Sequence, residues 1–146
     1  MFRTLVSIVG FLLAAVTAPP VSVTAFLVLA RLLPSDSHLR AAIADDLPMV
    51  YFFAFLLGVV PSAVFGALVL AVMRKALKPW PPKAWVLATG GAAAAALYGL
   101  ISTLVGFAPW GRAPLEDPAG TAAMAACILL SGAIAGLIYA PFAKRG

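Results

Sequence analysis

Four long apolar stretches, separated by short segments rich in proline and charged residues, constrain this chain of 146 residues more than any other feature. They run approximately over residues 5–33, 49–73, 85–107 and 120–142. About 20 helical residues cross a hydrocarbon core of roughly 30 Å, so each stretch is long enough to span a bilayer. The sequence therefore predicts an all-α fold: one integral membrane domain, residues 1–146, built as a bundle of four transmembrane helices.

Composition excludes the soluble alternatives. Hydrophobic residues make up 64% of the chain and charged residues 10%, whereas soluble domains are about half apolar and about a quarter charged. A cytosolic enzyme, a DNA-binding domain and a disordered chain are excluded on this ground. The first stretch begins like a signal peptide, but its apolar run continues past Pro19. We therefore expect a retained membrane helix there.

The distribution of positive charge predicts the orientation. Seven of the ten Lys and Arg residues flank one side of the expected bundle: Arg3, Arg74, Lys75, Lys78, Lys83, Lys144 and Arg145. All five acidic residues lie in the two connections on the other side. Because cationic flanks resist translocation, we expect a multi-pass protein of a bacterial-type inner membrane with both termini in the cytoplasm. The same basic clusters have a second interpretation as contacts to anionic lipids, whereas a nucleic-acid partner is not expected.

Tryptophans at the ends of the stretches are typical of membrane-interface anchors. Trp80 and Trp85 fall at the expected inner interface and Trp110 at the outer one. An indole at this depth keeps its apolar body in lipid and its N–H in contact with water. We expect these three residues to anchor the bundle.

Small residues recur at spacings of four within the stretches, which places them on one face of a helix. The glycines expected to pack helix against helix are Gly58, Gly66, Gly91, Gly99, Gly132 and Gly136. Without a side chain at these positions, two helix backbones approach closely and gain van der Waals contact.

Prolines occupy the middle of the first two stretches, at Pro19, Pro20 and Pro61. Each proline removes an N–H and leaves a backbone carbonyl without its helical donor at a depth where lipid offers no replacement. We expect kinks in these two helices. A candidate groove at the midplane has the following members: Pro19, Pro20, Pro61, Ser62, Tyr98, Ser102 and Ser131. The groove would hold a ligand or a partner's helix; alternatively, the kinked helices satisfy one another within the bundle.

Asp, Glu, Lys, Arg and His are absent between the ends of the stretches, and proton relays, ion-coupled carriers and haem sites need such groups inside the membrane. We expect no enzyme activity, no catalytic residues, no metal site and no cofactor. Two functions remain. The first is a non-catalytic accessory, assembly or stabilising subunit of a larger membrane complex, with lipids and other transmembrane subunits as partners. The alternative is a small carrier, channel or binding protein for a lipid or another hydrophobic ligand, acting as a homo-oligomer; whether a lipid, a quinone or a pigment would occupy the groove stays open.

Overall fold

The structure, a computed structural model, describes residues 2–31, 47–78, 80–104 and 118–144. Within these ranges the chain forms four helices and no strand: α1 (Phe2–Ala30), α3 (Leu47–Ala76), α4 (Ala84–Leu104) and α6 (Pro118–Ala143). All four are long and apolar enough to cross a bilayer. The predicted all-helical fold with four helices of membrane length is confirmed.

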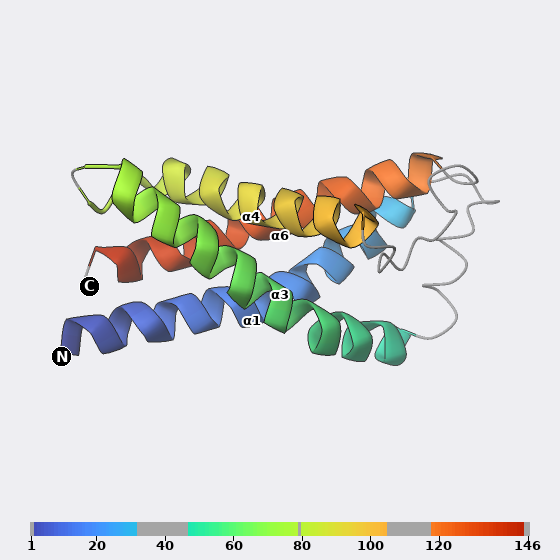
Figure 1. Ribbon diagram of the computed structural model, residues 1–146. Helices are drawn as coiled ribbons and strands as arrows, with labels where there is room; N and C mark the ends of the chain where they lie inside the picture. Colours follow the sequence, from blue (N-terminus) through green and yellow to red (C-terminus); the bar gives the residue numbers. More distant parts are fainter. Residues whose placement is uncertain (1, 32–46, 79, 105–117, 145–146) are drawn as a thin grey trace.

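The helices form a ring in which each one packs beside two others. α1 contacts α3 and α6, and α4 contacts the same two helices. Figure 1 shows that the chain termini and the α3–α4 connection lie together at one end of the bundle. We call this the basic end, because Arg74, Lys75, Lys78, Lys83 and Lys144 belong to it. The segments that carry all five acidic residues, 32–46 and 105–117, lie outside the described residues.

Helix boundaries differ from the expected ones by a few residues. α3 begins at Leu47 and ends at Ala76, so it is longer than the expected 49–73 at both ends. Pro48 and Pro118 lie in the first turns of α3 and α6, where a proline's missing N–H costs no helical hydrogen bond. Pro19, Pro20 and Pro61 lie inside α1 and α3, which continue through them. The expected kinks there stay predictions.

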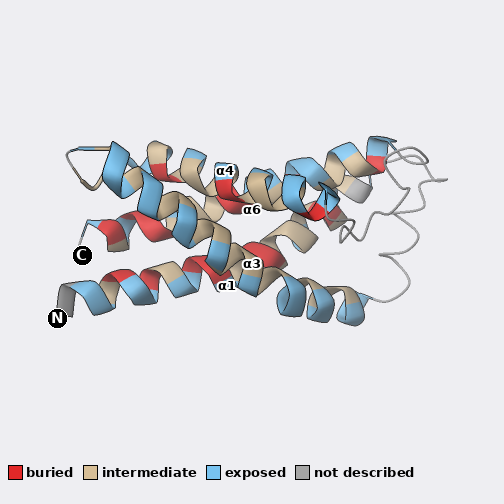
Figure 2. Cartoon of the chain, in the orientation of Figure 1, coloured by how far each residue is buried: buried red, intermediate tan, exposed pale blue. Residues whose placement is uncertain are grey.

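Burial is uneven around the ring. α6 buries seven residues, from Gly120 to Ala143, whereas α3 buries none (Figure 2). The contacts of α6 with α1 and α4 are also the most extensive in the bundle. α6 is therefore the centre of packing, and α3 is the helix that is held most loosely.

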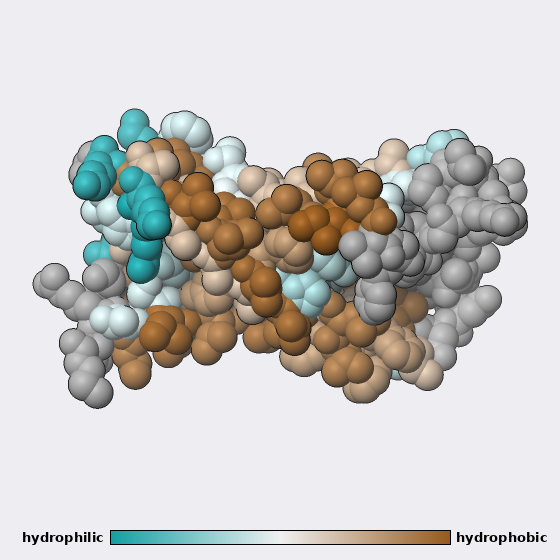
Figure 3. Space-filling model, in the orientation of Figure 1, coloured by the Kyte–Doolittle hydropathy of each residue, from teal (hydrophilic) through white to brown (hydrophobic). Residues whose placement is uncertain are grey.

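The outer surface of the bundle is apolar along much of its length. Figure 3 shows brown, hydrophobic side chains over the middle of the helices and teal, hydrophilic ones at the basic end. Large apolar side chains stay exposed on all four helices, among them Leu12, Val60, Leu100 and Leu137. A soluble protein rarely exposes apolar patches of this extent, so the surface agrees with a multi-pass membrane protein.

Glycines bring α4 and α6 into backbone contact. A methyl group added to Gly91 would overlap the Gly132 carbonyl, and one added to Gly132 would overlap the Gly91 carbonyl. At Gly136 the added methyl would meet the Leu87 carbonyl. These three glycines therefore let the two helices approach each other in the way that small residues allow in membranes.

The other three candidate packing glycines are not equivalent. A methyl group on Gly58 would lie 2.8 Å from Cγ of Pro19, and one on Gly66 would lie 3.2 Å from the Phe11 ring, so both face α1. Gly99 has no atom of the described residues within 4 Å of such a methyl group. Gly99 therefore does not pack against another described helix of this chain, and its expected packing role stays a prediction, because four-residue spacing identifies one helix face and does not show what covers it.

Candidate functional site

A cavity of about 750 Å³, partly open at the surface along α3, lies between the helices, and all four helices line it. It lies between two packed regions. At the basic end, Ala14, Leu87, Tyr139, Ala140 and Ala143 form one buried cluster. Farther along the bundle, Phe26 of α1 packs against Cys127 of α6 in a second cluster. The volume falls in the range of ligand sites, about 300–1,000 Å³.

The cavity is long. Its lining follows α3 from Met49 to Met73, which is about 36 Å at a rise of 1.5 Å per residue. On the other three helices the lining covers a shorter length, from Phe11 to Phe26, from Leu87 to Tyr98 and from Met124 to Tyr139. A single extended apolar chain has the appropriate shape.

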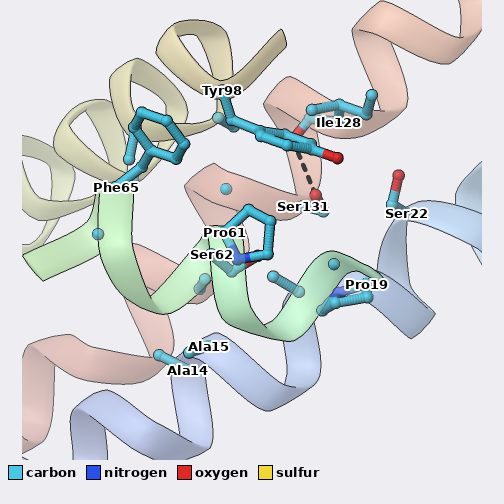
Figure 4. A pocket seen from close by; sticks show the side chains of 18 of the residues that line it. Ala14, Ala15, Pro19, Ser22, Pro61, Ser62, Phe65, Tyr98, Ile128 and Ser131 are labelled. Carbon is cyan, nitrogen blue, oxygen red and sulfur yellow. Dashed lines mark hydrogen bonds between the residues drawn. The ribbon is translucent and has the colours of Figure 1, made fainter. Parts of the chain in front are cut away.

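The middle of the cavity carries one hydroxyl from each helix: Ser22 of α1, Ser62 of α3, Tyr98 of α4 and Ser131 of α6 (Figure 4). Ser131 donates to the Ile128 carbonyl of its own helix at 2.8 Å. The other three make no hydrogen bond with the part of the chain that the structure describes. They are therefore available to a polar group on a bound molecule.

Tyr98 extends farthest into the cavity. Its ring packs on Phe65 of α3, with 6.0 Å between the ring centroids. Figure 4 shows the side chain reaching across from α4, with its hydroxyl turned toward the part of α1 that carries Ser22. The phenol thus presents a hydroxyl group in an otherwise apolar space.

Two of the three prolines line the same space. Pro19 and Pro61 are in the cavity wall, as are Ala15 and Leu57, whose carbonyls lie four residues before these prolines and lack a helical N–H donor. Two residues of the cavity wall therefore carry backbone carbonyls without a helical donor. Thr17 hydrogen-bonds the carbonyls of Leu13 and Ala14 instead.

Two residues of the candidate groove lie outside this cavity. Pro20 does not line it, and its carbonyl accepts a hydrogen bond from Thr24 at 2.8 Å. Ser102 is buried and donates to the Gly99 carbonyl of its own helix at 3.0 Å. The structure thus brings together Pro19, Pro61, Ser62, Tyr98 and Ser131 of the seven expected residues.

Hydrogen bonds attach α3 to the bundle near both of its ends. Near its start, the hydroxyls of Tyr51 and Thr24 lie 2.9 Å apart. Near its end, Arg74 donates through Nη2 to Ser7 Oγ and to the Tyr139 hydroxyl, each at 3.2 Å. Between these links α3 buries no residue, and the cavity lies along it.

Arg74, Ser7 and Tyr139 form a cluster that the sequence did not predict, and we call it the Arg74 cluster. The Ser7 and Tyr139 hydroxyls are hydrogen-bonded to each other at 2.7 Å and are both buried. Arg74 also lies over the Trp80 ring, 5.2 Å from its centroid, in cation–π geometry. No spacing in the sequence links Arg74 to Ser7 and Tyr139, which lie near the two termini. Leu70, one turn before Arg74, lines both the cavity and the smaller pocket beside Arg74.

The interface tryptophans take different positions. Trp85 is 64% exposed at the start of α4, as an anchor would be. Trp80 packs against the buried cluster at the basic end and under Arg74. Trp110 lies outside the described residues.

No family model, no curated protein and no solved structure matches this chain. Its function is therefore proposed from the geometry of the cavity and of the surface around it.

Proposed function

We propose that this protein binds one elongated, mostly apolar molecule, such as a lipid, inside a four-helix membrane bundle. The observation that carries the proposal is the long cavity of about 750 Å³ lined by all four helices. Its wall is apolar apart from a few hydroxyls and freed carbonyls, which is the usual pattern of a hydrophobic-ligand site. The absence of charged side chains from this lining favours an apolar body over an ion.

A route into the cavity from the bilayer runs between α3 and α4. These two helices share the least extensive of the four helix–helix contacts. On this side a paler patch interrupts the apolar surface between them (Figure 3). The middle of α3 packs against α1 at Gly58 and Gly66 and against α4 through the Phe65–Tyr98 ring pair, so entry of a chain between α3 and α4 requires these two rings to separate.

A cavity-filling substitution tests this function. Ala54 of α3 is half-buried and lines the cavity, so Ala54→Phe places a ring in the path of a ligand. We expect the purified, delipidated chain to bind one monooleoylglycerol molecule in native mass spectrometry, and Ala54→Phe to weaken this binding at least about tenfold.

The matched control is Val64→Phe on the same helix. Val64 is 58% exposed and lies outside the cavity lining, so the added ring faces outward and binding is expected to stay within about twofold. Equal binding by both variants, or no saturable binding by the wild type, would contradict the proposed function.

A second candidate function is an accessory subunit of a larger membrane complex. The observation that favours it is α3, which buries none of its residues and exposes Phe52, Phe53 and Phe55. Transmembrane helices of another subunit would cover this surface through van der Waals packing. Purification in mild detergent tests it: a stoichiometric larger partner supports this function, and a single-component homo-oligomer contradicts it.

The proposed setting is a bacterial-type inner membrane with both termini in the cytoplasm. Its support is the excess of Lys and Arg at the basic end, because short cationic flanks stay on the cytoplasmic side. Lipids are then the neighbours of the exposed apolar side chains and the nearest source of a ligand.

A further inference from the structure

Hydrogen-bond donors outnumber acceptors in the Arg74 cluster. A guanidinium carries five N–H groups and accepts no hydrogen bond, and Nη2 of Arg74 donates to two hydroxyl oxygens. The two hydroxyls share one hydrogen bond, which uses one of their two protons. Arg74 is exposed, so the N–H groups on Nε and Nη1, which have no acceptor in the part of the chain that the structure describes, are open to the surroundings of the bundle, and one O–H of the hydroxyl pair is likewise without an acceptor there.

No carboxylate compensates this charge in the described residues, since every Asp and Glu of the chain falls in 32–46 or 105–117. Four other described cations, Lys75, Lys78, Lys83 and Lys144, belong to the same basic end, whereas Arg31 follows the opposite end of α1. The cluster thus combines the planar set of guanidinium N–H donors, one hydroxyl proton without an acceptor, and several lysine residues at the same end of the bundle. This combination suits the oxygens of a phosphate group.

The Arg74 cluster lies beside the central cavity. A smaller pocket of about 270 Å³ lies against Thr4, Ser7, Ile8, Ala67, Ala71 and Arg74. Phe11, Leu70 and Tyr139 line both this pocket and the central cavity, so these three side chains separate the two. A molecule that extends from the guanidinium into the apolar interior has to pass between them.

The depth of the cluster also fits a lipid headgroup. Arg74 lies two residues before the end of α3 and against Trp80, a residue type typical of the membrane interface. It lies about 20 Å along the helix from Pro61, which is near the middle of α3. A lipid with its phosphate at Arg74 would place its acyl chain along the cavity toward the Tyr98 hydroxyl.

We propose that the central cavity binds an anionic membrane lipid whose phosphate is held by Arg74, Ser7 and Tyr139 while one acyl chain lies between the four helices. This assignment rests on the proposed function and adds the ligand's charge and orientation. Charge selectivity comes from the basic end, and the apolar interior contributes affinity that does not depend on the headgroup.

Two probes that differ only in the phosphate test the assignment: monooleoyl lysophosphatidate and monooleoylglycerol, each added to the delipidated full-length chain and counted by native mass spectrometry. We expect the wild type to bind lysophosphatidate at least about tenfold more tightly, because charge-assisted bonds to phosphate are roughly twice as strong as neutral ones. Inorganic phosphate alone is expected not to displace it at equal concentration. Displacement by phosphate would overturn a lipid as the occupant.

The matched variants are Arg74→Gln and Lys75→Gln. Each variant removes one positive charge, and the two residues are adjacent near the end of α3. Only Arg74 contacts Ser7 and Tyr139. Arg74→Gln is expected to bring lysophosphatidate down to the affinity of monooleoylglycerol and to leave the latter unchanged, while Lys75→Gln changes both by less than about twofold. Equal losses in the two variants, or no loss in Arg74→Gln, would overturn the assignment.

Arg74→Lys covers the case in which Arg74→Gln no longer folds. It keeps the charge but loses the planar fork of donors, so we expect an affinity for lysophosphatidate at least about threefold below that of the wild type. Unchanged lysophosphatidate affinity in a folded Arg74→Lys chain contradicts the assignment. Failure of the proposed function looks different: neither probe then binds saturably, and Ala54→Phe has no effect on either.

Discussion

Two tyrosines that line the same cavity have opposite hydrogen-bonding states. Tyr139 is 3% exposed, and its hydroxyl is bonded to Ser7 and receives an N–H from Arg74. Tyr98 is half-buried, and its hydroxyl has no partner among the described residues. The first phenol joins α6 to α1 and α3, whereas the second faces the cavity. A residue's type and depth therefore do not determine its role; its neighbours on other helices do.

Removing each hydroxyl separates these roles. Tyr139→Phe is expected to lower the free energy of unfolding by about 1–2 kcal/mol, the upper part of the range for hydrogen bonds inside membranes. Tyr98→Phe is expected to leave thermal stability unchanged and to weaken binding of monooleoylglycerol, because the cavity loses a polar partner for the ligand. Thermal unfolding in detergent and native mass spectrometry measure the two quantities.

The comparison is informative because both variants change a single oxygen. Loss of stability in Tyr98→Phe would show that its hydroxyl has a structural partner. Unchanged stability and unchanged ligand binding together would place the ligand away from Tyr98.

The helices themselves were predictable, and their contacts were only partly so. Length and apolarity determine where a chain crosses the membrane, and so four membrane-length helices followed directly from the sequence. The spacing of small residues identified Gly91, Gly132 and Gly136 as packing positions, but it did not show that α4 and α6 are the two helices that meet there. The sequence did not predict that Gly99 lies where no other described helix is close to α4. The Arg74 cluster was missed because its members lie far apart in the sequence, and only the packing of three helices brings them together.

Leucine substitutions on one helix measure this difference. Gly91→Leu is expected to destabilise the bundle by about 1–3 kcal/mol, because the side chain meets the α6 backbone and forces the helices apart. Gly99→Leu is expected to be neutral or slightly stabilising, because it meets open space and replaces a glycine inside a helix. Thermal unfolding in the same detergent compares the two. Equal destabilisation would show that Gly99 also lies in a helix contact.

At the scale of the whole molecule, polarity varies along the bundle. The basic end collects most of the described cations and the Arg74 cluster, the middle holds the hydroxyl-lined cavity, and the acidic residues belong to segments 32–46 and 105–117, outside the described residues. An anionic lipid with its phosphate at the basic end would come from one leaflet only. In the orientation that we propose from the positive-inside rule, this would be the cytoplasmic leaflet.

Cysteine labelling tests the orientation on which this conclusion depends. In a Cys127→Ala background, which removes the chain's single native cysteine, Glu116→Cys and Lys78→Cys each introduce one thiol. A membrane-impermeant maleimide is expected to label Glu116→Cys in intact cells and Lys78→Cys only after permeabilisation, because the cationic α3–α4 connection stays inside. The opposite pattern would invert the topology and place the Arg74 cluster in the outer leaflet. Labelling of both residues in intact cells would contradict an odd number of membrane crossings between them and, with it, the four-span arrangement.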